Sequence, residues 1–190
     1  KPVMIGYWKC MSQTEEYLDV FDEQNQPTGV ALPRSQVHAE GLWHRTVHIY
    51  LYRQGTLGLE FLLHLRSMQK ETGPGRWDTR FGGHIKAGQS VEEGVRDELH
   101  EEIGLDASRI NLVEGEWDKR DNPPNREYTK IYFLEFNDSL DTLRFNDGEV
   151  DDVKWATVEE IKSGMQTNPD HYSARLDGFE KVVKYLLAKI

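Results

Sequence analysis

The sequence predicts a mixed α/β fold of the α+β kind in a single domain. Segments rich in β-branched and aromatic residues alternate irregularly with segments of helical periodicity, which is typical of mixed architectures. The 190 residues are enough for one sizeable core, and neither a repeat nor a linker divides them. We therefore interpret residues 1–190 as one domain.

An N-terminal extension of about residues 16–41 is predicted to form a hairpin and a helix. Two strand-like runs flank a polar turn at Asn25-Gln26-Pro27, and the run RSQVHAEG, residues 34–41, is helical in character.

The strands that follow are rich in aliphatic and aromatic residues. Residues 45–53 and 59–67 flank the turn-forming run QGTLG and are predicted to pair. Further strands are expected at 112–117, 127–136 and 150–155, and helices at 158–165 and 172–188. The last helix places its apolar residues on one stripe: Phe179, Val182, Val183, Leu186 and Leu187.

A helix of about thirteen residues is predicted to begin after Ser90. Ser90 and Glu93 have the spacing of a capping box, and Gly104 is a suitable left-handed terminator. At about 100° per residue, three glutamates share an arc of about 100° on one face. They are Glu98, Glu101 and Glu102.

The neighbouring face of this helix is apolar and is expected to pack on the sheet. It carries Val91, Val95, Leu99 and Ile103. Gly94 lies inside the acidic arc, so we expect the preceding Gly82-Gly83 loop to approach the helix there.

Three carboxylates on one helical face have two interpretations. They form an ordinary solvated acidic face, or they bind a hard cation such as Mg²⁺ or Mn²⁺ that relieves their repulsion and aligns substrate phosphates.

The composition excludes several classes of partner. The net charge of -10 disfavours a nucleic acid polymer or an anionic membrane, and the short apolar runs predict no membrane span. Cys10 is the only cysteine, and no cleavable signal pattern is visible. We expect a cytoplasmic protein without disulfides; a homodimer is compatible with the sequence.

Residues 82–105, GGHIKAGQSVEEGVRDELHEEIGL, resemble the signature of the Nudix hydrolases. That signature is a glycine, five residues, a glutamate, seven residues, and then Arg-Glu-aliphatic-any-Glu-Glu-any-Gly-aliphatic. Gln89 stands where the family has glutamate, and Asp97 stands where it has arginine. The matching positions are Gly83, Glu98, Leu99, Glu101, Glu102, Gly104 and Leu105.

The flanking segments are similar to the branch that includes type 1 isopentenyl diphosphate isomerase and its hydrolase-like bacterial relatives. This resemblance covers most of residues 17–155. It implies the α/β/α sandwich with a mixed sheet between helices, and Mg²⁺ or Mn²⁺ as cofactor. The implied partner is a small-molecule diphosphate, a nucleoside diphosphate linked to another moiety.

The resemblance also implies roles for individual residues. Glu98 would be a metal ligand and general base, and Glu101 a metal ligand and second catalytic carboxylate. Glu102 and the Gly83 carbonyl would complete the ligands, with Glu127 as a further candidate ligand whose alternative is an ordinary strand-start acid.

The two departures from the signature leave a second function open. The family arginine helps to orient the acidic cluster, whereas Asp97 adds negative charge, and Gln89 is at best a weak, uncharged ligand. The leading hypothesis is a diphosphohydrolase (pyrophosphatase); the rival is a nucleotide-binding or regulatory module with impaired catalysis.

Isomerase activity is disfavoured. Type 1 isomerases place a cysteine before the Gly-His that is here Gly83-His84, and this chain has Gly82. They also carry two acids on a later strand, where this chain has Glu127 and Thr129. His44 and His84 nevertheless stand where those enzymes have metal-binding imidazoles.

Three residues are candidates for substrate binding. Arg66 is a forked donor suited to phosphate, with a surface ion pair as the alternative. His84 adjoins the motif and has a structural hydrogen bond as its alternative, and Trp77 would stack on a base unless it packs in the core. Glu149 has two interpretations, reaching the metal site or lying in a solvated turn, of which the turn is favoured. Ordinary packing or surface roles are expected for His38, His48, His64, His100 and His171.

Overall fold

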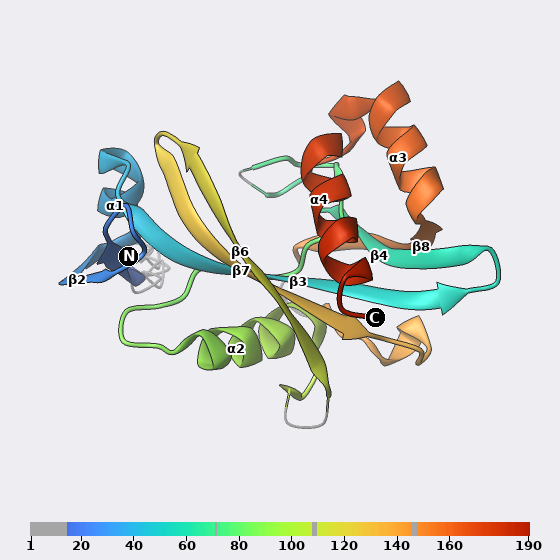
Figure 1. Cartoon of the computed structure of the whole chain (residues 1–190), viewed down its shortest axis with the longest axis horizontal. Coiled ribbons are helices and arrows are strands. Elements are labelled where there is room, and N and C mark those ends of the chain that lie inside the picture. Colours follow the sequence, from blue (N-terminus) through green and yellow to red (C-terminus); the bar gives the residue numbers. More distant parts are fainter. Residues whose placement is uncertain (1–14, 71, 108–109, 146–147) are drawn as a thin grey trace, which may run out of the picture.

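The computed structural model describes residues 15–70, 72–107, 110–145 and 148–190; Cys10 lies outside them. Eight strands form one mixed sheet that has helices on both faces (Figure 1). The strands are β1 (Tyr17–Phe21), β2 (Pro27–Pro33), β3 (Trp43–Gly55), β4 (Gly58–Arg66), β5 (Trp77–Asp78), β6 (Leu112–Asn122), β7 (Asn125–Glu135) and β8 (Val150–Thr157). The helices are α1 (Arg34–Glu40), α2 (Val91–Ile103), α3 (Val158–Thr167) and α4 (Leu176–Leu187), and the 3-10 turns η2 (Leu140–Thr142) and η3 (Pro169–His171) precede β8 and α4.

The long strand β3 organises the sheet. It pairs in parallel with β7 from Trp43↔Arg126 to Tyr52↔Glu135, whereas the other strand pairs are antiparallel. On its other edge β3 meets β4 only from Tyr52 onward. The loop after β5 occupies the gap between them, bridging Ile49↔Phe81 and Thr46↔His84. The glycine-containing loop is thereby inserted into the edge of the sheet.

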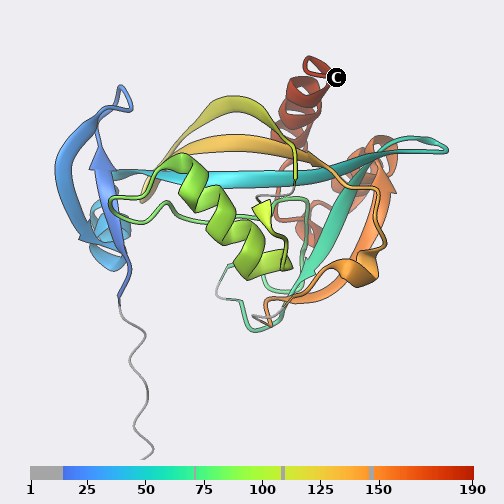
Figure 2. The same cartoon turned by 90° about the horizontal axis from the view of Figure 1, so that it is seen from below.

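The helices pack on opposite faces of the sheet, which confirms the predicted α/β/α sandwich. Helix α2 covers one face, and α3 and α4 cover the other (Figures 1 and 2). One core joins the inward side chains of α2 to β3, β4 and β7, with Val47, Ile49, Leu62, Val95, Leu99, Ile103 and Leu134 among its residues. The second joins α3 and α4 to the other face, with Tyr50, Phe61, Phe133, Ile161, Phe179, Val182 and Leu186.

Helix α2 has the predicted length and ends. The Ser90 hydroxyl accepts from the Glu93 N–H at 3.2 Å, and the Glu93 carboxylate accepts from the Ser90 N–H at 2.8 Å. Gly104 ends the helix with φ 69. The expected neighbour of Gly94 was wrong, because a Cβ at Gly94 would lie 3.3 Å from the Ile85 side chain rather than against the Gly82-Gly83 loop.

Two boundaries differ from the predictions. Helix α4 begins at Leu176 instead of residue 172, because Tyr172 forms a bridge with Trp77 and the Ser173 N–H donates to the Trp77 carbonyl at 2.9 Å. Strand β6 continues to Asn122 instead of ending at residue 117, and a tight turn joins it to β7 at the tip of the hairpin. Among the described helices none is both long and apolar enough to cross a membrane.

Candidate metal and diphosphate site

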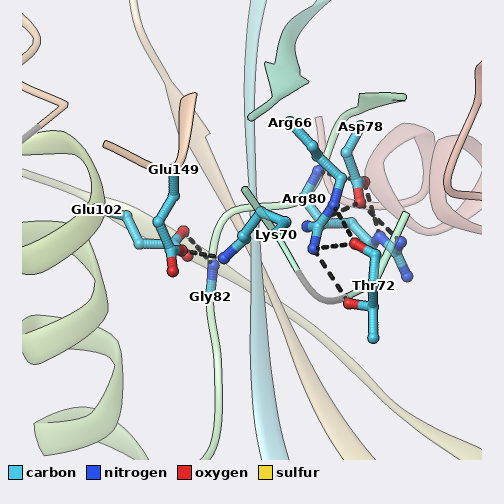
Figure 3. A network of polar contacts seen from close by, with 8 residues as sticks. All are labelled: Arg66, Lys70, Thr72, Asp78, Arg80, Gly82, Glu102 and Glu149. Carbon is cyan, nitrogen blue, oxygen red and sulfur yellow. Dashed lines mark hydrogen bonds and ion pairs between the residues drawn. The ribbon is translucent and has the colours of Figure 1, made fainter. Parts of the chain in front are cut away.

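The site begins where the Gly82-Gly83 loop meets helix α2. The Gly82 N–H donates to Glu102 Oε2 at 2.7 Å (Figure 3). Gly82 has φ 139, and a Cβ there would overlap the Val47 carbonyl oxygen of β3. A Cβ on Gly83 would lie 2.6 Å from Glu98 Oε1. Position 82 therefore needs glycine for the loop to fit against β3, whereas a side chain at position 83 would have to displace the Glu98 carboxylate.

Glu98 and Glu102 turn toward this loop and are largely removed from solvent. Burial, followed by the nearby Glu101 carboxylate, raises the pKa of Glu98 to about 7. Burial, followed by the Glu98 carboxylate, raises the pKa of Glu102 to about 8. Both side chains thus face a position where a divalent cation would offset desolvation and mutual repulsion.

Glu101 points outward, unlike the other two glutamates. Its side chain is 58% exposed, and one carboxylate oxygen lies 3.5 Å from Lys86 Nζ. The predicted convergence of three carboxylates is therefore seen for Glu98 and Glu102, with Glu101 at the rim. Two partly buried carboxylates fit Mg²⁺ or Mn²⁺, because such ions usually complete their coordination with water and substrate oxygens.

Cationic side chains lie beside the acidic pair. Lys70 forms an ion pair with Glu149, and both charges influence the pKa of Glu102. Figure 3 shows this pair between Glu102 and Arg66. The Arg66 guanidinium donates to the Thr72 carbonyl at 2.8 and 3.1 Å.

A buried ion pair between Arg80 and Asp78 lies next to Arg66. Arg80 donates to both oxygens of the Asp78 carboxylate at 2.8 Å, and Arg66 lies 3.9 Å from the same carboxylate. Burial alone would raise the pKa of Asp78, but the Arg80 guanidinium lowers it overall. The Arg66 head is therefore held in place, which suits contact with a phosphate.

The other two predicted ligands do not lie in this groove. The Gly83 carbonyl accepts from the Val47 N–H at 2.9 Å, so it is turned toward the sheet. Glu127 pairs with His44 in the β3–β7 register and is 7% exposed. Since side chains alternate along β7, Glu127 lies on the face covered by α3 and α4 rather than the α2 face. Its role as a ligand beside Glu98 remains a prediction.

Three histidines form a separate cluster. His38 Nε2 lies 3.3 Å from His44 Nε2 and 3.1 Å from His84 Nε2. The ligand atoms of the three histidines all lie within 4.8 Å of one another. Among the described residues, this is the group of three or more His, Cys, Asp or Glu side chains that meets that limit. The tertiary structure brings His38 to His44 and His84, and the ordinary role expected for it stays a prediction.

The predicted substrate residues are thus separated in space. His84 belongs to the histidine cluster, whereas Arg66 contacts Thr72 and Asp78. Trp77 lies at the sheet edge, with Lys154 Nζ 4.0 Å from its ring centroid, so its ring already has a cationic neighbour. Its packing role is favoured over stacking on a base.

A cavity of about 510 Å³ lies on the α4 side of the sheet. His48, Tyr50 and Arg80 line it, with residues of β6 and α4. Two more lining residues, Thr79 and Ser173, have buried hydroxyl groups without a hydrogen-bond partner among the described residues. Buried hydroxyls are rarely left unpaired, so this cavity suits a polar ligand.

Three residues near these sites were not singled out from the sequence as site residues. Lys70 follows Arg66 by four positions in a loop, with no pattern to mark it. Glu149 was expected in a solvated turn but pairs with Lys70, 79 positions away. His38 offered one signal, the presence of His44 six residues later, but α1 and β3 are different elements.

Comparisons with known proteins show the family of the chain. The NUDIX domain family matches residues 42–176. An uncharacterised Nudix hydrolase from Clostridium acetobutylicum is 30% identical over 184 residues, covering 93% of this chain and 87% of that protein. The isopentenyl-diphosphate Delta-isomerase of Aliivibrio fischeri is 28% identical over 176 residues, covering 90% and 97%.

Solved structures support the fold. DR0079 from Deinococcus radiodurans superimposes with a TM-score of 0.72 at 20% identity, covering 90% of this chain and 99% of that one. A C. elegans Ap4A hydrolase complex has a TM-score of 0.53 at 19% identity, covering 76% and 98%. With the family match over residues 42–176, the capped acidic helix and the glycine loop packed against it, the chain belongs to the Nudix family.

Proposed function

We propose that this protein is a divalent-metal-dependent hydrolase of the diphosphate linkage in a nucleoside diphosphate-type small molecule. The observation that carries the proposal is the pair of partly buried carboxylates, Glu98 and Glu102, on one face of α2, with the Lys70 charge acting on Glu102 and Arg66 four positions before Lys70. The carboxylates suit a Mg²⁺ or Mn²⁺ ion, and the cations suit phosphate oxygens.

Each of these residues has its own role in the proposed reaction. Glu98 and Glu102 would hold the ion, which would supply charge neutralisation and acidify water. Glu98 also accepts the proton of the attacking water. Oxygen adds to one phosphorus, the bridging P–O bond breaks, and two phosphate-terminated products leave. Arg66 donates hydrogen bonds to the non-bridging phosphate oxygens. Lys70 leaves its ion pair with Glu149 and binds the substrate.

A phosphate-release screen with Mn²⁺ tests the proposal. The substrates are nucleoside diphosphate sugars, nucleoside triphosphates and dinucleoside polyphosphates, with a coupled phosphatase where the product requires it. We expect turnover of at least one class that is lost with EDTA. No turnover, together with a ligand-induced rise in melting temperature, would instead support the nucleotide-binding module.

The histidine cluster supports a second candidate function, binding of one transition-metal ion. Burial, the first cause in each case, lowers the pKa of His38, His44 and His84, so all three are neutral near pH 7. His44 Nδ1 faces the Leu42 carbonyl at 3.0 Å, which places its proton on Nδ1 and leaves the Nε2 lone pair facing His38. The Glu127 carboxylate opposes this lowering of the His38 pKa, so a carboxylate is also near.

Co²⁺ titration of the metal-free protein separates the two metal sites. We expect visible absorption bands of low-symmetry Co²⁺ that disappear in His38→Ala and persist in Glu98→Gln. Absence of these bands in the unmodified protein, or their persistence in His38→Ala, would exclude the cluster as a metal site.

A further inference from the structure

The two residues that depart from the Nudix signature contact each other. Gln89 Nε2 donates to Asp97 Oδ2 at 2.7 Å, and Gln89 Oε1 accepts from the Lys86 backbone N–H at 2.9 Å. The loop before α2 is thus tied to the second turn of the helix by a neutral amide and a carboxylate. This link also fixes the backbone at Lys86.

Lys86 extends along the acidic face from this anchored position. Its Nζ lies 3.5 Å from Glu101 Oε1 and 3.9 Å from Asp97 Oδ2. The Lys86 ammonium therefore pairs with two carboxylates of α2, on the side where Glu101 is exposed.

We propose that Lys86 is a positioning residue for the carboxylates of α2, anchored by the Gln89–Asp97 hydrogen bond. Lys86, in the loop before α2, provides the positive charge that an arginine provides at position 97 in the Nudix signature. The inference rests on the proposed function for its effect on turnover, whereas the Gln89–Asp97 coupling is independent of any reaction.

The contacts predict strong coupling between positions 89 and 97. Gln89→Glu would place two carboxylates at hydrogen-bond distance, and Asp97→Arg would place a guanidinium beside Lys86 while leaving the Gln89 amide without its acceptor. The double variant Gln89→Glu/Asp97→Arg pairs opposite charges across the same contact. In that background the cation at position 86 becomes dispensable.

A thermal double-mutant cycle on the metal-free protein at pH 8 tests this coupling. Each single variant is expected to melt several degrees lower than the unmodified protein, and the double variant is expected to recover most of that loss. Additive losses would overturn the pairing. Because no substrate is needed, this result is independent of the proposed function.

Turnover and Mn²⁺ affinity test the role of Lys86. Lys86→Met is expected to lower kcat about tenfold with little change in KM and to weaken Mn²⁺ binding, as measured by electron paramagnetic resonance. Lys86→Arg should retain both properties, and Lys86→Met in the double-variant background should lose neither. Lys162→Met is the control, because Lys162 pairs with Glu180 at 2.9 Å far from the site.

Tighter Mn²⁺ binding by Lys86→Met would overturn the proposal, since it would mean that Lys86 only competes with the ion for the carboxylates. If the unmodified protein hydrolyses none of the screened substrates, the proposed function fails, while the Mn²⁺ affinities still decide the positioning role.

Discussion

Glu98→Gln is expected to lower kcat about 10³-fold, the largest effect of any single side chain on turnover. Glutamine keeps the shape of the side chain against Gly83, where space is limiting. It removes the negative charge that holds the cation and the group that accepts a proton from water. Steady-state kinetics with saturating Mn²⁺ measures the loss.

The same substitution is expected to stabilise the metal-free protein at high pH. The folded-state pKa of Glu98, about 7, lies above the ordinary carboxyl value. The contribution of Glu98 to the free energy of unfolding is therefore fully present below about pH 4.5 and is lost as the pH rises through 7. Because glutamine does not titrate, the variant should lose less stability than the unmodified protein between pH 5 and pH 9, as measured by thermal unfolding in EDTA.

Glu92→Gln provides the matched control. Glu92 lies in the first turn of the same helix, but its side chain is exposed. We expect turnover and the pH dependence of unfolding to remain close to those of the unmodified protein. Full turnover by Glu98→Gln would remove this residue from the proposed chemistry.

Gly82→Ala is expected to destabilise the fold by roughly 4 kcal/mol, the largest effect on stability of a single methyl group. The added Cβ would overlap the Val47 carbonyl, and φ 139 is unfavourable for any L side chain. The loop must then leave the edge of β3, which also removes the Gly82 N–H from Glu102. For a chain of this size, the melting temperature should fall by about 10 °C.

Gly88→Ala distinguishes overlap from backbone strain. Gly88 also has a positive φ, 78, but a Cβ there would meet no atom within 4 Å. We expect a loss of about 1 kcal/mol from the backbone conformation alone. Equal losses in the two variants would show that the Val47 contact does not restrict position 82.

The Gly82 geometry also bears on isomerase activity. Gly82→Cys introduces the thiol position of type 1 isomerases, yet the Cβ of cysteine meets the same carbonyl. At the second isomerase position, Thr129 shares a hydrogen bond of 2.7 Å with Thr46 between their hydroxyls. The packing around Gly82 and Thr129 therefore fits these two residues and not the cysteine and second carboxylate of type 1 isomerases.

The sequence by itself determined the features that depend on near neighbours. The capping box at Ser90 and Glu93, the left-handed end at Gly104 and the apolar stripe of α2 follow from residues a few positions apart. Helical periodicity then predicted which face packs on the sheet. The motif indicated the family because its glycines and acids have a fixed spacing.

Only the tertiary structure decided which distant groups meet. His38 reaches His84 across 46 positions, and Lys70 reaches Glu149 across 79. Glu98, Glu101 and Glu102 share one helical arc, yet Glu98 and Glu102 are partly buried against the inserted loop whereas Glu101 is exposed beside Lys86. Helical periodicity determines the direction of a side chain relative to its own axis, whereas burial and charge depend on what the rest of the chain places opposite it.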